Sequence, residues 1–200
     1  MRRLQALALR RLQLQSGLPA AWATMASLQR LELTSAGSIT GALPEAWSSL
    51  RSLRELQLGT LPISGSLPRN WGSLVGITSV VIRDLKLTGP LPPEWSSMRA
   101  LNHLSLLGNA ISGELPPGWG SMASLKALFL GATDLSGTRP PQWRSMTSLG
   151  TLSLDSTNVS GTLPPQWSGM KNVWKMKLDN CDLSGSLPSS WSEMPKLKSL

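Results

Sequence analysis

The chain has 200 residues, with 19 Lys and Arg against 11 Asp and Glu, which gives a formal net charge of +8. Because the cations crowd both ends and are otherwise scattered among acids, the charge does not indicate a nucleic-acid partner. No apolar run approaches the roughly 18 residues that span a bilayer. A single cysteine, Cys181, excludes an internal disulfide and leaves the redox compartment open.

Tryptophan recurs along the whole chain, first after 25 residues and then six times after 24. A fixed period of roughly 20 to 29 residues, opened each time by L-x-x-L-x-L, is the pattern of leucine-rich repeats. The sequence therefore predicts one solenoid over residues 1–200, with about eight 24-residue repeats and a truncated ninth. We expect an α/β repeat fold, a curved horseshoe with one parallel β-sheet on its concave face and short helices or irregular segments on its convex face. The tryptophans are Trp22, Trp47, Trp71, Trp95, Trp119, Trp143, Trp167 and Trp191.

Each repeat begins with the leucine-rich segment, such as Leu101, Leu104 and Leu106, which we expect to form a strand with its leucines facing the core. Three residues beyond the last leucine lies the position that the general pattern fills with Asn or Cys. Only the later repeats keep a polar or thiol group there. We therefore expect side chains to form hydrogen bonds to buried backbone groups in some turns of the array and not in others. The occupants are Leu12, Gly37, Leu61, Leu85, Asn109, Thr133, Thr157 and Cys181.

The repeat then passes through S-G-x-L-P, as in residues 112–116. Its glycine recurs at one fixed position, which predicts a positive φ or a close backbone approach. The proline three residues before each tryptophan predicts the start of a short helix. The Met or Leu three residues after each tryptophan is expected to face the core. Since the eight spaced tryptophans hold a fixed place between proline and this residue, packing explains them better than an aromatic ligand ladder.

The turns VSGTLPPQWSGM and LTGPLPPEWSSM resemble the leucine-rich repeats of kinetoplastid surface antigens of the promastigote type, and the similarity covers essentially the whole chain. The S-G-x-L-P signature is also similar to plant-type leucine-rich repeats of receptor ectodomains. The kinetoplastid resemblance implies a secreted or lipid-anchored surface protein. The segment shows no signal peptide, capping cysteines or anchor signal, and it begins on a strand and stops in a ninth turn. We therefore expect a fragment of a longer protein.

The polar residues do not assemble a catalytic or metal site. His103 is the only histidine, and we interpret it as a solvated or contact residue on the open strand face. Glu32 and Glu55 fall on neighbouring strands, but Arg30 and Arg54 lie beside them, so charge pairing is expected. One His and one Cys cannot hold a tetrahedral metal, and glycine-rich phosphate loops are absent. We expect no enzyme activity and no cofactor.

Binding is the function that this fold favours, because a concave sheet presents variable side chains on a rigid surface. One cluster on the sixth to eighth strands combines aromatic and basic side chains across the small residues Gly150 and Ser153, with walls roughly 10 Å apart. Trp174 is the one tryptophan outside the regular series. We predict a ligand-binding patch at Lys126, Phe129, Trp174, Lys175 and Lys177.

The leading hypothesis is a non-enzymatic surface-exposed adhesion protein that recognises a protein or glycan through its concave sheet. The alternatives are the ectodomain of a signalling receptor and an intracellular scaffold, so a cell-surface or secreted location stands against a cytoplasmic one. Asn158 begins an Asn-Val-Ser sequon and is a candidate glycosylation site if the chain is secreted. The oligomeric state does not follow from the sequence.

Overall fold

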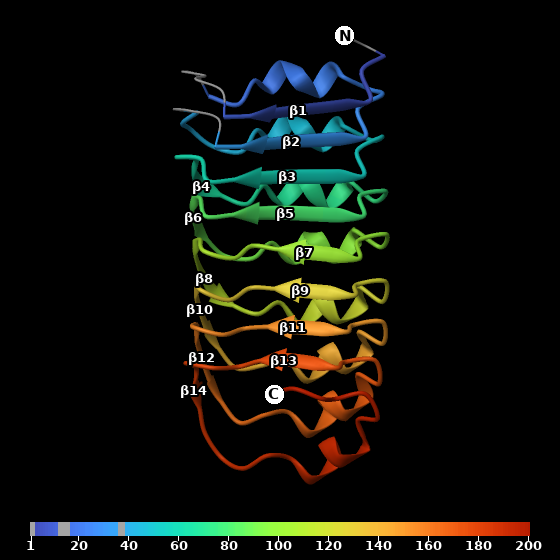
Figure 1. Cartoon of the computed structure of the whole chain (residues 1–200), viewed down its shortest axis with the longest axis vertical. Coiled ribbons are helices and arrows are strands. Elements are labelled where there is room, and N and C mark those ends of the chain that lie inside the picture. The colour runs from blue at the N-terminus through green and yellow to red at the C-terminus, as the bar shows by residue number, and fades with distance from the viewer. Residues whose placement is uncertain (1–2, 12–16, 36–38) are drawn as a thin grey trace.

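A computed structural model describes residues 3–11, 17–35 and 39–200. The chain winds through stacked turns whose main strands lie side by side from β1 to β13 (Figure 1). In most turns a main strand is followed by a second strand and then by a short helix. The stack confirms the leucine-rich-repeat solenoid predicted from the period of the tryptophans.

The main sheet is formed by the L-x-x-L-x-L segments, and the described residues give it eight parallel strands. Pairing in register places equivalent positions of successive turns side by side, as Leu104 lies between Val80 and Leu128. Because side chains alternate across a strand, these three residues all face the core and are fully buried. The strands are β1 (Ala6–Arg10), β2 (Arg30–Thr34), β3 (Glu55–Gly59), β5 (Ser79–Arg83), β7 (His103–Ser105), β9 (Ala127–Phe129), β11 (Thr151–Ser153) and β13 (Lys175–Lys177).

A second parallel sheet lies along one side of the stack, where the sequence predicted only a turn. Within the described residues it has six strands, which lie at or just before the S-G-x-L-P segments. The repeated glycine has the expected positive φ, for example 82° at Gly113 and 83° at Gly161. These strands are short and most of them contain a glycine, so their strand propensity is low and it is the stacking of turns that pairs them. They are β4 (Ser64–Ser66), β6 (Lys86–Gly89), β8 (Ala110–Glu114), β10 (Asp134–Gly137), β12 (Asn158–Gly161) and β14 (Asp182–Leu183).

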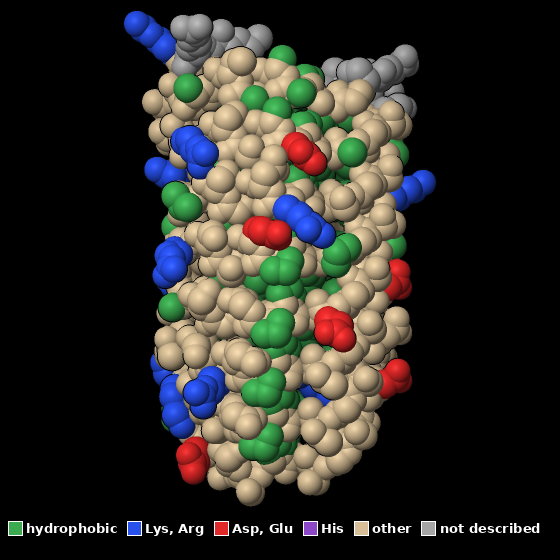
Figure 2. Space-filling model, turned by 180° about the vertical axis from the view of Figure 1, so that it is seen from behind, with side chains coloured by type: hydrophobic (Ala, Val, Ile, Leu, Met, Phe, Trp, Pro, Cys, Tyr) green, Lys and Arg blue, Asp and Glu red, His purple; other side chains and the backbone are tan. Residues whose placement is uncertain are grey.

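Short 3₁₀ helices form the side opposite the main sheet. Each begins directly after the proline that precedes tryptophan, for example Pro116 with φ −67°, which confirms the predicted start. Figure 2 shows this side of the molecule, with hydrophobic side chains running down its middle. The helices are η1 (Ala20–Thr24), η2 (Glu45–Ser49), η3 (Arg69–Ser73), η4 (Pro93–Ser97), η5 (Pro117–Ser121), η6 (Pro141–Ser145), η7 (Pro165–Gly169) and η8 (Ser189–Glu193).

The regular tryptophans form a buried ladder behind these helices. Trp95 and Trp119 are fully buried and stack with ring centroids 6.5 Å apart. The indole Nε1 of Trp119 donates a hydrogen bond to the carbonyl of Pro92 in the preceding turn at 3.0 Å. The same bond to the preceding turn recurs in each repeat from Trp47 to Trp191. The ladder therefore has the structural role assigned to it from the sequence.

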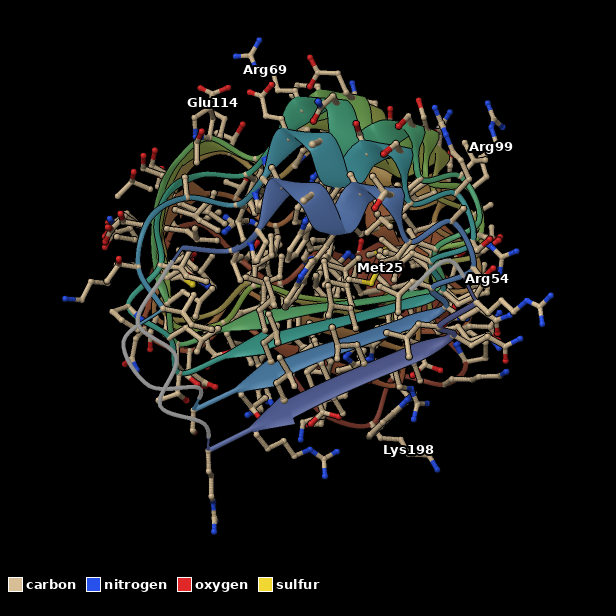
Figure 3. The ribbon with its side chains drawn as sticks, turned by 90° about the horizontal axis from the view of Figure 1, so that it is seen from above. Met25, Arg54, Arg69, Arg99, Glu114 and Lys198 are labelled. Carbon is tan, nitrogen blue, oxygen red and sulfur yellow. The ribbon has the colours of Figure 1, made fainter. Side chains whose placement is uncertain are left out.

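The core lies between the main sheet and the helices, and Met25 points into it in the view along the stack (Figure 3).

The polar ladder is the column of positions that the general repeat pattern fills with Asn or Cys. Asn109 of this ladder donates to the carbonyls of Ile82 and Leu106 at 3.0 and 2.9 Å, and Thr133 donates to the carbonyl of Leu130 at 2.7 Å. Leu61 is buried without such a bond, so backbone satisfaction is uneven as expected. The ladder positions Leu12 and Gly37 lie outside the described residues.

Arg139 interrupts the core at the leucine position of S-G-x-L-P. The equivalent residues Leu91 and Leu115 are buried leucines, and Arg139 is itself only 2% exposed. Its Nη2 donates to the carbonyls of Gly161 at 2.6 Å and Ser160 at 3.1 Å, whereas Nε and Nη1 have no partner among the described residues. Burial lowers the pKa of the Arg139 guanidinium from its ordinary value. The sixth repeat thus contains a buried cation that no carboxylate pairs with among the described residues.

Candidate functional site: a groove on the concave sheet

A groove of about 340 Å³ opens on the exposed face of the main sheet, across β3, β5, β7 and β9. We call it the concave groove and define it by Gln57, Val81, Arg83, His103, Ser105, Leu107 and Phe129. The in-register pairing of Val81, Ser105 and Phe129 brings residues 24 positions apart in sequence to neighbouring places. An imidazole, a guanidinium, a hydroxyl and an apolar wall therefore converge on one hollow.

The aromatic wall of the groove is a pair rather than a single ring. His103 and Phe129 have ring centroids 5.5 Å apart at an interplanar angle of 47°, a tilted geometry that aromatic pairs favour. Both side chains are half-buried, so each retains a face that a ligand can cover. The pair would hold an apolar or aromatic ligand group against Val81 and Leu107.

The polar floor of the groove is the hydroxyl of Ser105. Ser105 is 2% exposed, and its Oγ has no hydrogen-bond partner among the described residues. The equivalent Ser153 donates instead to the Asp155 carboxylate two residues later, but the residue at that place after Ser105 is Leu107. A buried polar atom left unpaired costs about 1–3 kcal/mol. Because the Oγ is itself covered, a ligand atom would recover that free energy only after a neighbouring side chain moves aside.

His103 is the titratable group of the groove. Burial lowers its pKa from the ordinary value, and the positive charge of Arg83 lowers it further. The neutral imidazole is therefore favoured near neutral pH and offers one donor and one acceptor.

The lowered pKa of His103 predicts a loss of stability in mild acid. Below the unfolded-state pKa, near 6.5, the unfolded chain binds a proton that the folded chain resists. This contribution is therefore absent above that pH and grows more destabilising as the pH falls toward the folded-state value. We expect His103→Gln to reduce the loss of urea stability between pH 7.5 and 5.5. An identical loss in the variant and the parent would show that His103 does not titrate in this way.

Two carboxylates of the main sheet, Glu32 and Glu55, form ion pairs. Glu32 receives two bonds from Arg10, one of them from Nη2 at 2.6 Å, and these bonds lower the pKa of the Glu32 carboxyl. Glu55 pairs with Arg30 at 2.6 Å. The expected charge pairing is confirmed, but Arg54 takes no part, since its guanidinium donates to the Gly76 carbonyl at 2.9 Å. The two carboxylates are thus neutralised separately.

The predicted patch is divided between two places on the sheet. Phe129 packs against His103 and belongs to the concave groove. Trp174 is 48% exposed and lies over Gly150, where an added Cβ would meet the indole at 3.3 Å. The indole therefore occupies the space over the small residue between the two predicted walls. Lys126 and Lys177 are exposed and Lys175 is half-buried, so a basic and aromatic patch at Trp174 stays a prediction.

Sequence reasoning missed Arg83, Ser105 and Leu107 as groove residues and interpreted His103 as a lone contact residue. The signal for Arg83 and Leu107 lies in the column after each L-x-L segment, whereas Ser105 lies inside that segment and gave no signal. Most other repeats place Gly or Asp there, whereas the groove has Arg83 and Leu107.

Asn158, the candidate glycosylation site, is exposed at the start of β12, as a glycosylation acceptor must be.

The described part of the chain contains only short 3₁₀ helices. None of its helices is long and apolar enough to cross a membrane. No group of three or more His, Cys, Asp or Glu side chains there is arranged to hold a metal ion.

The stacked sheets, the positive-φ glycines and the side-chain bonds of Asn109 and Thr133 define a leucine-rich-repeat solenoid. No family model matches the sequence, and no curated protein matches it. The fold is similar to that of the leucine-rich-repeat ectodomain of the plant membrane receptor kinase GASSHO1/SCHENGEN3 from Arabidopsis thaliana, in complex with Casparian strip integrity factor 2. That similarity has a TM-score of 0.95 and 29% identity over 99% of this chain.

Two other solved structures share the fold. The Arabidopsis receptor kinase HAESA, in complex with the peptide hormone IDA and a co-receptor, matches 99% of this chain with a TM-score of 0.93 and 26% identity. A leucine-rich-repeat protein from Leptospira interrogans covers 92% of this chain and 45% of its own, with a TM-score of 0.78 and 22% identity. This chain spans only 24% and 33% of the two plant chains.

Proposed function

We propose that this chain is a non-enzymatic binding domain that recognises a peptide or protein segment through the concave groove. The observation that carries the proposal is the convergence of an unpaired buried hydroxyl at Ser105 with the half-buried pair of His103 and Phe129. Such a site combines a hydrophobic anchor with a few placed polar groups, as binding pockets do. The Arabidopsis structures support this proposal, since one is a complex with a peptide hormone.

We further propose that the domain acts outside the cell, as the surface portion of an adhesion protein or of a receptor. Its similarity to plant receptor ectodomains supports this location. The resemblance of its turns to kinetoplastid surface antigens supports it as well. Asn158 would then be available for glycosylation, because it is exposed on β12.

A peptide-display experiment tests the binding site. Random 12-residue peptides would be selected on the parent protein and their affinities measured on variants. Truncation of an aromatic anchor costs about 2 kcal/mol, which is roughly thirtyfold in affinity. We expect Phe129→Ala to weaken the selected peptides by about this factor, and Arg83→Ala to weaken them less. Trp174→Ala and Lys177→Ala test the alternative patch on the same sheet.

The outcomes separate the two places on the concave sheet. If Phe129→Ala and His103→Ala leave affinity unchanged while Trp174→Ala abolishes it, the site lies at the predicted basic patch. If none of these variants changes affinity, the concave sheet is not the binding surface.

A further inference from the structure

A larger groove lies elsewhere on the molecule, at the corner where the second sheet gives way to the helices. It measures about 620 Å³ and is lined by residues 66–70, 90–93 and 114–118 together with Glu45. We call it the proline groove. Three consecutive turns build it, and Arg69 and Glu114 project outward at this corner in the view along the stack (Figure 3).

The walls of the proline groove are rigid and mostly apolar. Proline fixes φ, and the repeated L-P segment places a proline ring at the equivalent position of each turn. The carbonyls of Pro68, Pro92 and Pro116 already accept the indole N–H bonds of the buried tryptophans at 3.0 Å each. A ligand can therefore contact the faces of the proline rings, chiefly those of Pro93 and Pro117, which are exposed.

The rim of the proline groove carries charged side chains that form no ion pair within the described part of the chain. Glu45, Arg69 and Glu114 are exposed, and the ion pairs found among the described residues include none of them. Glu94 borders an adjoining hollow that shares Arg69. In a chain of net charge +8, three carboxylates here stand against one guanidinium. The rim is therefore complementary to a cation.

We propose that the proline groove is a second interaction surface, which binds a protein segment that presents an aromatic side chain next to a lysine or arginine. The electron-rich face of an aromatic ring packs against the C–H groups of proline rings, and burial of such a ring removes a large apolar area from water. The neighbouring cation of the segment meets Glu114 or Glu45. This surface lies outside the concave groove and shares no residue with it.

Three capped tripeptides serve as probes: Lys-Trp-Lys, Lys-Ala-Lys and Glu-Trp-Glu. Amide chemical shifts of Arg69, Asn70 and Gly118 in a ¹⁵N-labelled protein report their binding. Full burial of one aromatic side chain corresponds to roughly tenfold or more in affinity. We expect Lys-Trp-Lys to bind at least about tenfold more tightly than Lys-Ala-Lys. It should bind severalfold more tightly than Glu-Trp-Glu, because each exposed charge pair contributes up to about 1 kcal/mol.

Gly118→Trp fills the groove in the protein itself. A Cβ at Gly118 meets no atom closer than 4.0 Å, so the fold should accept the new side chain. We expect this variant to lose Lys-Trp-Lys binding, whereas Gln166→Trp, at the equivalent position two turns further on, should retain it. Phe129→Ala should also retain it, which separates this surface from the concave groove. Glu114→Lys is the second variant, and it should weaken binding by reversing a charge on the rim rather than by filling the groove.

Two results would overturn the proposal. Equal affinity for Lys-Trp-Lys and Lys-Ala-Lys would mean that the aromatic ring is not recognised. Shifts that cluster on the main sheet, or that survive both Gly118→Trp and Glu114→Lys in folded protein, would place the binding elsewhere.

Discussion

Trp119→Ala is expected to lower the free energy of unfolding by about 3–5 kcal/mol, the range for removing a large buried aromatic side chain. Trp119 is fully buried, stacks on Trp95 and donates to the Pro92 carbonyl at 3.0 Å. The alanine would leave a cavity between two turns and an unpaired carbonyl. Urea unfolding with a comparison of midpoint and slope measures the change.

Two control variants identify which interaction of the tryptophan ladder matters. Trp119→Phe keeps most of the ring but removes the indole N–H, so about 1–3 kcal/mol of the loss should remain as the penalty for the unpaired carbonyl. Trp174→Ala removes the tryptophan that is 48% exposed, and we expect a change below about 1 kcal/mol. Equal losses for Trp119→Ala and Trp174→Ala would contradict the assignment of the regular tryptophans to the core.

Arg139→Leu is expected to stabilise the protein, which is unusual for a substitution at a fully buried position. The guanidinium is desolvated without a carboxylate, and two of its nitrogens lack partners among the described residues. Replacing a buried charge with a well-packed apolar side chain gains up to about 1–4 kcal/mol. For a chain of this size that corresponds to a rise in Tm of roughly 2–4 °C for each kcal/mol. Differential scanning calorimetry measures it.

The matched control for this substitution is Arg144→Leu. Arg144 lies in η6 of the same repeat and is exposed, so the same change of side chain there should alter stability by less than about 0.5 kcal/mol. A lower Tm for Arg139→Leu would mean that the bonds from Nη2 to Ser160 and Gly161 outweigh the desolvation of the cation. Arg139→Met, which keeps a long unbranched stem, would then separate poor packing of leucine from loss of those bonds.

The candidate site was harder to predict from sequence than the fold. Phe129 was identified as a concave residue because packing does not dictate its position in L-x-L. Its partner was expected toward Trp174, but the ring lies against His103 instead. Ser105 gave no signal of its own, since it becomes a site residue only because Leu107 cannot bond its hydroxyl. Such relations depend on which side chains meet across strands, and a single sequence does not specify rotamers or neighbours.

By itself the sequence determined the architecture of this protein. The 24-residue period, the core leucines, the positive-φ glycine and the proline before each tryptophan are all local rules repeated in every turn, and each repetition reinforces the same register. The tertiary structure alone decided the second sheet, the burial of Arg139 and the two grooves. These features arise between turns, where residues about 24 positions apart come into contact, and a contact of that kind depends on the height and tilt at which rigid turns stack.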